Sequence, residues 1–228
     1  MPLGARVNKV LGLAWDFEEP TISFDLTAFA KRAEGLTATK RNTLKLLAGI
    51  FGPLEIIGSV KITAKILFQE ACREKIGFDD PLDGSIKKAA EVWIKSLLEC
   101  GQIRMKRCVY KHIQEEVLEC SVHGIADASK KGYCVVTYLV YTTRTGKYSR
   151  MFTSKTRVDP LKQLSIPRLE LLACLILARL ECTIKNALIS QVSIQNVKLW
   201  SDSITALYWI KNQGEWKQFV RQRVNEIL

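Results

Sequence analysis

Residues 122–129, Val122-His123-Gly124-Ile125-Ala126-Asp127-Ala128-Ser129, decide how the rest of the chain is interpreted. From Val117 to Ala126 apolar and polar side chains alternate, which predicts a β-strand with one buried face. The strand is expected to end on Asp127, because Ala128–Gly132 has the composition of a turn. A carboxylate at the end of a strand has a rigid backbone, so it can face a ligand in a fixed position.

Three further strands and two helices are predicted after this stretch. Strands over Tyr133–Tyr141 and Tyr148–Val158 would complete an antiparallel meander of three strands. A helix is expected to open at Ser165, and a fourth strand, Val197–Ser201, runs into a second helix that starts at Ser203. The pattern predicts a mixed sheet with flanking helices, in the α/β (α+β) class.

Three carboxylates lie at comparable places in these elements. Asp202 follows the fourth strand as Asp127 follows the first, and Glu170 is expected in the first turn of the first helix, whose positive end favours a carboxylate. If the fourth strand lies beside the first, the three side chains come within range of one another. Oxygen ligands of this kind suit a hard divalent cation that keeps waters and bridges a substrate phosphate.

Each carboxylate also has an ordinary structural interpretation. Asp127 could form an Asx turn, Asp202 could cap the helix at Ser203, and Glu170 could be a partner of the helix dipole only. Their joint placement and the positive charge of the chain favour the functional interpretation. His123 shares a strand face with Asp127, where a solvated histidine is the ordinary expectation.

The composition favours a polyanionic partner. The 228 residues include 34 Lys and Arg against 23 Asp and Glu, a net charge of +11, so nucleic acid is the first candidate. An anionic membrane is disfavoured because the basic residues are spread along the chain. The longest apolar run, Leu171–Ala178, is too short to cross a bilayer, so we expect no membrane partner.

The N-terminal sequence and the cysteine content predict an intracellular protein. It would lie in the cytoplasm, for example in a virus-like particle, or in the nucleus. The first residues lack an apolar signal core, and the seven cysteines include no Cys-x-x-Cys pair, which is typical of free thiols in a reducing compartment. A zinc site is disfavoured because His112 and His123 are the two histidines of the chain. Trp200 and Trp209 are expected in the core, and Trp216 is left open.

The first half reads as two short strands, Val10–Trp15 and Thr21–Phe24, followed by helices. One helix is expected to open at Thr39, with Leu44 and Leu47 facing inward, and to stop at Gly52-Pro53. Residues 37 to 101 therefore form a small helical unit with basic edges.

Two more helices are predicted in that unit. Ser59 is the expected N-cap of the first of them and Asp83 that of the second. The second helix carries an apolar stripe and should end at a left-handed Gly101. The stripe consists of Ile86, Ala90, Trp93 and Leu97.

Adjacent aspartates invite a polymerase interpretation of Asp79-Asp80, because such pairs hold metal in many nucleotidyl transferases. Pro81 follows directly, and a helix end and a helix cap flank the pair. These features favour a loop with capping duty, and the polymerase interpretation is rejected.

Four runs in the second half share the motifs of one family, namely Gly124–Ser129, Ser154–Leu161, Ile166–Ala173 and Leu199–Ser203. They resemble the ribonuclease H-like part of BEL/Pao (Pao-type) retrotransposon Pol polyproteins. Runs in the first half resemble the segment that joins this family's polymerase palm to its ribonuclease H domain, namely Lys9–Trp15, Thr39–Arg41, Ile50–Leu54 and Ala64–Glu70.

The resemblance implies a three-part organisation. Residues 1–36 would be the end of the reverse transcriptase palm, 37–110 a helical thumb or connection region, and 111–228 a ribonuclease H-like domain without its last strand and helix. The partners implied are an RNA/DNA hybrid and the remainder of the Pol polyprotein.

The resemblance also implies a chemistry. Asp127, Glu170 and Asp202 match three of the four acidic metal ligands of such domains, and this order of acids differs from that of integrases. The expected reaction is hydrolysis of the RNA strand of a hybrid by two Mg²⁺ ions about 4 Å apart, with Mn²⁺ as an alternative. Nucleic-acid contacts are expected from Lys40, Arg41, Ser129, Lys155, Arg157, Arg168 and Ser203.

Two features of the family are missing from this sequence. It lacks the Tyr-x-Asp-Asp motif of the polymerase, and the fourth acid would lie beyond Leu228, with Glu226 on the wrong element to replace it. Gly52 and Glu55 also depart from the usual residues of the family. We therefore expect hybrid binding with weak or silent hydrolysis. The alternatives are a non-catalytic binding or structural remnant of a retroelement, and a fragment never made as a stable protein.

Overall fold

A computed structural model of the chain divides into two compact units, residues 1–108 and 109–228. The structure describes residues 7–10, 12–19, 21–50, 52, 54–108, 113, 115–188, 190, 192–212 and 214–228. His112 and Pro53, which entered the sequence predictions, lie outside these residues. The division falls close to the predicted boundary at residue 110, while the three-part assignment of domains stays a prediction.

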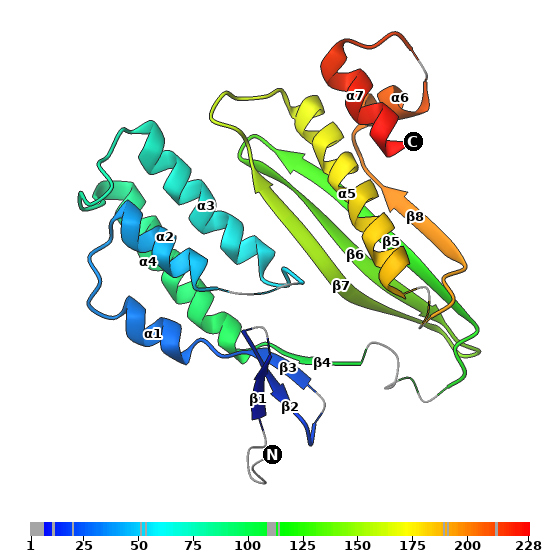
Figure 1. Ribbon diagram of the computed structural model, residues 1–228, viewed down its shortest axis with the longest axis horizontal. Coiled ribbons are helices and arrows are strands. Elements are labelled where there is room, and N and C mark those ends of the chain that lie inside the picture. The colour runs from blue at the N-terminus through cyan, green and yellow to red at the C-terminus, as the bar shows by residue number, and fades with distance from the viewer. Residues whose placement is uncertain are drawn as a thin grey trace. The chain divides into compact units, whose positions relative to one another are not determined.

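The first unit combines a small antiparallel sheet with four helices. Its sheet has the order β1-β2-β3-β4, formed by Val7–Val10, Leu13–Asp16, Thr21–Phe24 and Arg104–Lys106. The α-helices are α1 (Thr27–Ala33), α2 (Lys40–Ala48), α3 (Gly58–Arg73) and α4 (Gly84–Glu99), and the short 3-10 helix η1 (Cys100–Gln102) follows α4. Figure 1 shows these helices and strands in blue to green.

An apolar stripe on α4 holds this unit together. Its members Ile86, Ala90, Trp93 and Leu97 recur at helical spacing and are all buried, as the sequence predicts. The Trp93 indole N–H also donates to the Val60 carbonyl on α3, which satisfies its polar atom inside the core. These four side chains therefore anchor the helical unit.

Several local predictions for this unit are wrong. The expected strand 10–15 is a hairpin of β1 and β2, because Gly12 has a φ of 78° that lets the chain turn back. Helix α1 was missed in a segment expected to hold strands. In α2, Leu46 is buried and Leu44 is exposed, so the inward face differs from the predicted one.

The predicted helix ends also differ in detail. Helix α2 starts at Lys40, one residue after the predicted start at Thr39, and the Thr39 side chain caps it by accepting from the Asn42 N–H. Helix α3 starts at Gly58 and leaves Ser59 inside its first turn. Asp83 holds the N-cap position of α4 without a side-chain cap bond. Gly101 lies in η1 and lacks a positive φ, because the chain continues α4 as a tighter helix and not as a left-handed turn.

The second unit is built on a mixed sheet of order β7-β6-β5-β8 (Figure 1). Strands β5 (Glu119–Ser129), β6 (Gly132–Thr142) and β7 (Lys147–Val158) form the predicted antiparallel meander. Strand β8 (Asn196–Trp200) pairs in parallel with β5, which is the neighbour relation that the sequence argument required. The predicted mixed α/β fold is confirmed.

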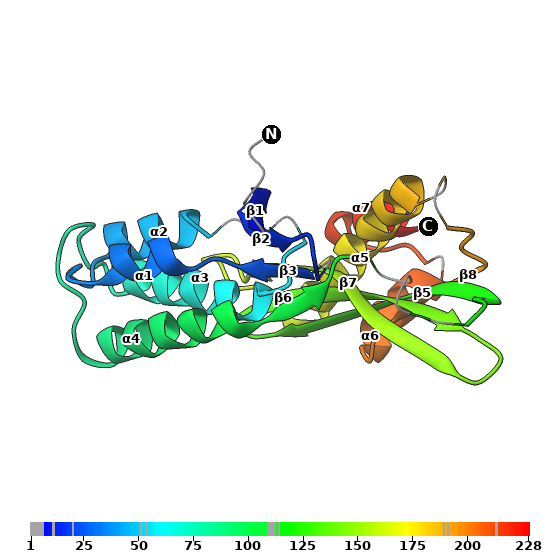
Figure 2. The same ribbon diagram turned by 90° about the horizontal axis from the view of Figure 1, so that it is seen from below.

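A long helix covers one face of this sheet. Helix α5 (Ile166–Leu188) follows β7 and lies across the strands (Figures 1 and 2). Its inward side chains join those of alternate β5 residues, including Val122 and Ala126, in one buried cluster. The alternation read from the sequence therefore faces α5 with its apolar half.

Two shorter helices complete the unit. Helix α6 (Ile204–Lys211) follows β8, and α7 (Gln218–Ile227) packs on α5. Trp209, Trp216 and Phe219 pack against a small buried cluster around Leu171, which answers the open question about Trp216. Trp200 is 53% exposed, so its predicted place in the core is wrong.

Candidate metal and nucleic-acid site

Asp127 is held by the sheet itself. It is paired with Cys134 across β5 and β6, and β5 continues two residues further, to Ser129. The chain reverses at residues 130–131, so the alternative in which Asp127 forms an Asx turn is wrong. The side chain lies on the face opposite Ala126 and is exposed, so a rigid backbone presents an accessible carboxylate.

Glu170 is held by a buried stretch of α5. Its neighbours Leu169 and Leu171 are fully buried, and Glu170 itself is 5% exposed. The helix begins at Ile166, so Glu170 falls just after the first turn, and the predicted first-turn position is off by one residue. Its Oε1 accepts the Ala128 backbone N–H at 3.2 Å, whereas Oε2 is buried with no partner among the described residues.

Asp202 lies between β8 and α6. Parallel pairing of β8 with β5, up to Ile125 and Trp200, brings Asp202 to the same end of the sheet as Asp127. The N-cap of α6 is Ser203, whose side chain accepts the Ala206 N–H at 3.2 Å. Asp202 therefore has no capping role, and its exposed carboxylate is available for another partner.

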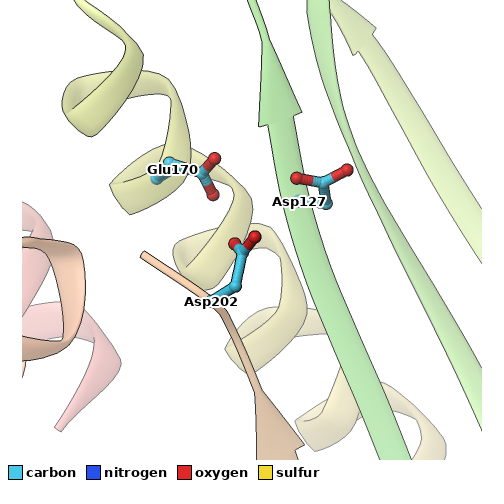
Figure 3. A group of neighbouring side chains, drawn as sticks. All are labelled: Asp127, Glu170 and Asp202. Carbon is cyan, nitrogen blue, oxygen red and sulfur yellow. The ribbon is translucent and has the colours of Figure 1, made fainter. Parts of the chain in front are cut away.

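The three carboxylates converge. One oxygen from each of Asp127, Glu170 and Asp202 can be chosen so that all lie within 4.8 Å of one another, and Figure 3 shows the side chains directed toward one another from β5, α5 and the end of β8. Burial raises the pKa of Glu170, the Ala128 N–H lowers it, and the charges of Asp127 and Asp202 raise it again. This cluster of carboxylates is called the acidic cluster below.

The donor set fits a divalent cation. In the described part of the chain no Lys or Arg forms an ion pair with any of the three carboxylates. Like charges held this close repel one another unless a cation neutralises them. Glu170 Oε2 supplies a buried acceptor that still lacks a donor, and carboxylate oxygens are the ligands that Mg²⁺ and Mn²⁺ prefer.

Predicted nucleic-acid contacts in the second unit lie on several elements. Arg157 and Lys155 are on β7, Arg168 is on α5 two residues before Glu170, and Ser203 caps α6. Ser129 ends β5, where its hydroxyl donates to the Gly132 carbonyl. Arg168 is exposed, and its guanidinium lies 5.1 Å from the centroid of the Phe219 ring on α7.

The two predicted contacts in the first unit are engaged within it. Lys40 is buried, with its Nζ 4.0 Å from the Cys72 sulfur and 5.7 Å from the Phe78 ring centroid. Arg41 forms a two-pronged ion pair with Asp79, at 2.6 and 2.9 Å. Lys40 is therefore part of the packing of this unit and Arg41 is ion-paired on its surface, and their nucleic-acid role stays a prediction.

Sequence reasoning missed the small contacts that fix the backbone on either side of Asp202. The Ser201 hydroxyl accepts the Ser203 N–H at 3.3 Å and also hydrogen-bonds the Cys174 thiol of α5. The sequence showed Cys174 as a small residue one turn after Glu170, but a partner on another element is visible only in three dimensions. These contacts tie α5 to the turn that carries Asp202.

The second unit has a mixed sheet of order β7-β6-β5-β8 that is crossed by a helix. It carries carboxylates on β5, on α5 and after β8. This combination defines a ribonuclease H-like domain. The sequence model of the family described as "Pao retrotransposon-like RNaseH-like domain" matches residues 39–203. The chain belongs to this family. Its function is therefore tied to the nucleic acid of a retroelement.

Other comparisons add little. A solved structure of the foamy viral protease-reverse transcriptase in complex with dsDNA is similar over 98% of this chain, with 13% identity and a TM-score of 0.48. The chain spans 42% of the length of that protein. The search of curated proteins found no match.

None of the helices in the described residues is long and apolar enough to span a membrane.

Proposed function

We propose that the second unit binds an RNA/DNA hybrid and hydrolyses its RNA strand slowly, with Mg²⁺ or Mn²⁺ held by Asp127, Glu170 and Asp202. The observation that supports this most directly is the convergence, within 4.8 Å of one another, of three carboxylates that form no ion pair with a Lys or Arg of the described residues. The family supplies the retroelement context. The net charge of +11 favours the polyanion as substrate.

The three carboxylates have different roles in the proposed site. Asp127 and Asp202 are exposed and would bind the ion on the side open to solvent and to the scissile phosphate. The buried Glu170 would be the ligand on the protein side. When bound, the divalent ion supplies a Lewis acid and a lowered pKa of bound water. Arg168 is exposed, and we expect its guanidinium to bind a phosphate of the hybrid.

Slow hydrolysis is expected because the cluster has three acids. The described residues contain no fourth carboxylate that groups with them. Glu226, the acid nearest the end of the chain, pairs with Arg179 at 2.5 Å on the α5–α7 contact. Three carboxylates can hold one dication firmly, whereas a second one would be bound weakly.

Cleavage of a labelled hybrid tests the proposal. Purified protein with Mg²⁺ or Mn²⁺ should cut the RNA strand, and Asp127→Asn should reduce the rate at least 100-fold because the ligand set is broken. Glu226→Gln is the matched control, since it removes a carboxylate of the same unit outside the cluster, and it should cut at the wild-type rate. Equal cutting by Asp127→Asn would refute the assignment of Asp127 as a metal ligand.

A second candidate is a binding module without catalysis, because the acids that converge among the described residues are three and not four. In that case hybrid binding would weaken steeply with added salt, because Lys and Arg release counterions from the phosphates. Cleavage dependent on a divalent ion would then be absent from wild type and variants alike. The salt series and the cleavage assay together separate the two functions.

A further inference from the structure

Gly124 lies where the three elements of the acidic cluster touch. A Cβ added at this position would lie 2.5 Å from Leu177 Cδ1 on α5 and 3.0 Å from Leu199 Cδ2 on β8. Carbon atoms in contact normally stay about 3.5–4.0 Å apart, so no side chain fits here without a shift. The bare backbone of β5 thus allows a leucine of α5 and one of β8 to pack directly on it.

This contact lies at a similar distance from every carboxylate. Asp127 is three residues beyond Gly124 and Asp202 three residues beyond Leu199, which is about 10 Å along each extended chain. Glu170 is seven residues before Leu177, two turns or about 10 Å along the helix. A displacement at the contact is therefore transmitted along three rigid elements to all three ligands.

The surroundings give a larger side chain at position 124 little room. Leu177 is 2% exposed and belongs to the main core cluster of the unit, so its rotation is blocked by packed neighbours. Leu199 is exposed and can move, but it is carried by the strand that leads to Asp202. An added methyl group would thus push α5 or β8 away from β5 by roughly 1 Å.

We propose that Gly124 is the positioning residue of the acidic cluster, because the lack of a side chain there sets the spacing of Asp127, Glu170 and Asp202 through the close contacts of Leu177 and Leu199 with the Gly124 backbone. The inference rests on the proposed function for its consequence, which is cation affinity. The spacing itself is a geometric property that can be measured without any ion. A misplacement of about 1 Å at a reactive centre can cost about 100-fold in rate.

The test measures Mn²⁺ binding by calorimetry for wild type and three variants. Gly124→Ala should bind Mn²⁺ at least tenfold more weakly while it remains folded by circular dichroism. Gly146→Ala is the matched control, because nothing lies within 4 Å of an added Cβ at that turn and its φ is not positive. It should bind like wild type.

The double variant Gly124→Ala/Leu177→Val is the decisive one. Shortening Leu177 removes Cδ1, the atom that an alanine would strike most closely, and the remaining close neighbour on β8, Leu199, is exposed and can move, so most of the affinity should return. This rescue would not follow from a general loss of stability, because Leu177→Val removes further core contacts. If Gly124→Ala does not fold, the folded double variant still tests the inference: wild-type affinity supports it, and an affinity reduced tenfold or more overturns it.

A crystal structure of Gly124→Ala keeps this test separate from the proposed function. In this variant we expect the oxygens of Asp127, Glu170 and Asp202 that lie within 4.8 Å of one another in the wild type to be farther apart. Oxygens that keep their wild-type positions, or wild-type Mn²⁺ affinity in folded Gly124→Ala, would overturn the role of Gly124. Wild-type protein that binds no Mn²⁺ would refute the metal site, while the crystal structure would still decide on the positioning.

Discussion

The two units each bring aspartates together, with opposite outcomes. In the first unit Asp79 binds the Arg41 guanidinium through both oxygens, and Asp80 accepts the Gly77 N–H at 2.8 Å. In the second unit Asp127 and Asp202 approach Glu170 with no cation from the described residues between them. Carboxylates whose partners belong to their own unit are structural, whereas a converging set without such partners is suited to bind a cation from solution.

The largest expected effect comes from exchanging one acid in each unit. Asp202→Asn should weaken Mn²⁺ binding at least 100-fold, because a charged ligand is lost, and the metal-free protein should melt at a higher temperature as repulsion in the cluster falls. Asp79→Asn should leave Mn²⁺ binding unchanged and lower the melting temperature slightly by breaking the exposed Arg41 pair. Calorimetric titration and thermal denaturation check both variants.

The contrast between the units would be lost if both variants bound Mn²⁺ equally well. It would be sharpened by a third measurement, the melting temperature with saturating Mn²⁺. The ion should raise the melting temperature of wild type and of Asp79→Asn, and much less that of Asp202→Asn, since ligand binding to the folded state stabilises it.

Lowering the pH should reduce the affinity of the acidic cluster for a cation at a pH where a carboxylate with an ordinary pKa is still ionised. The pKa of Glu170 is raised above its usual 4.5, so a proton competes with the ion already above that pH. In metal-free protein the sign for stability is opposite: the folded state binds this proton more tightly than the unfolded chain, so stability falls as pH rises through the raised pKa. Mn²⁺ affinity and melting temperature measured from pH 5 to 8 test both slopes.

A comparison with Glu170→Gln isolates this group. The variant should bind Mn²⁺ more weakly at pH 7, and its affinity should change less between pH 5 and pH 7 than that of wild type. An equal change in the two proteins would show that another group causes the pH dependence.

A smaller effect is expected at the other buried acid of α5. Glu181 is 7% exposed, both its oxygens lack partners among the described residues, and burial raises its pKa, with Lys185 lowering it. Glu181→Leu should therefore raise the free energy of unfolding at pH 7 by roughly 1–3 kcal/mol, since an unsatisfied polar group is replaced by an apolar one. Urea denaturation at pH 7 and pH 5 measures the gain, which should shrink at pH 5.

The outcome at Glu181 separates two kinds of buried acid on one helix. Glu181→Leu should leave Mn²⁺ affinity unchanged, whereas Glu170→Leu should remove it. A loss of stability in Glu181→Leu would show that this carboxylate has a partner beyond the described residues.

Much of the second unit could be predicted because its local patterns are strong. The alternation in β5 and the start of α5 near Pro167 were read correctly, and the three acids were chosen by their places at element ends. The wrong predictions concern burial that depends on contacts with other elements, which the local sequence pattern does not reveal. Lys40 looked like a surface cation, but its helix turns that face toward Cys72 and Phe78.

The prediction for Trp200 failed for a different reason. A large aromatic residue in an apolar strand normally packs in the core, but Trp200 pairs with the exposed Ile125 of β5, on the face opposite the buried Val122 and Ala126 that α5 covers. Which face a helix covers depends on the packing of the whole layer, and a five-residue strand carries too little alternation to reveal it.

The sequence by itself determined the strands, the long helix and the identity of the three acids, because alternation and helical spacing are local properties of the chain. The tertiary structure alone decided that the Asp202 turn is tied to α5 through Cys174 and Ser201, and that Leu177 and Leu199 each pack on Gly124. These contacts join residues about 27 to 75 positions apart. They depend on how tightly a helix and two strands pack, which no local pattern records.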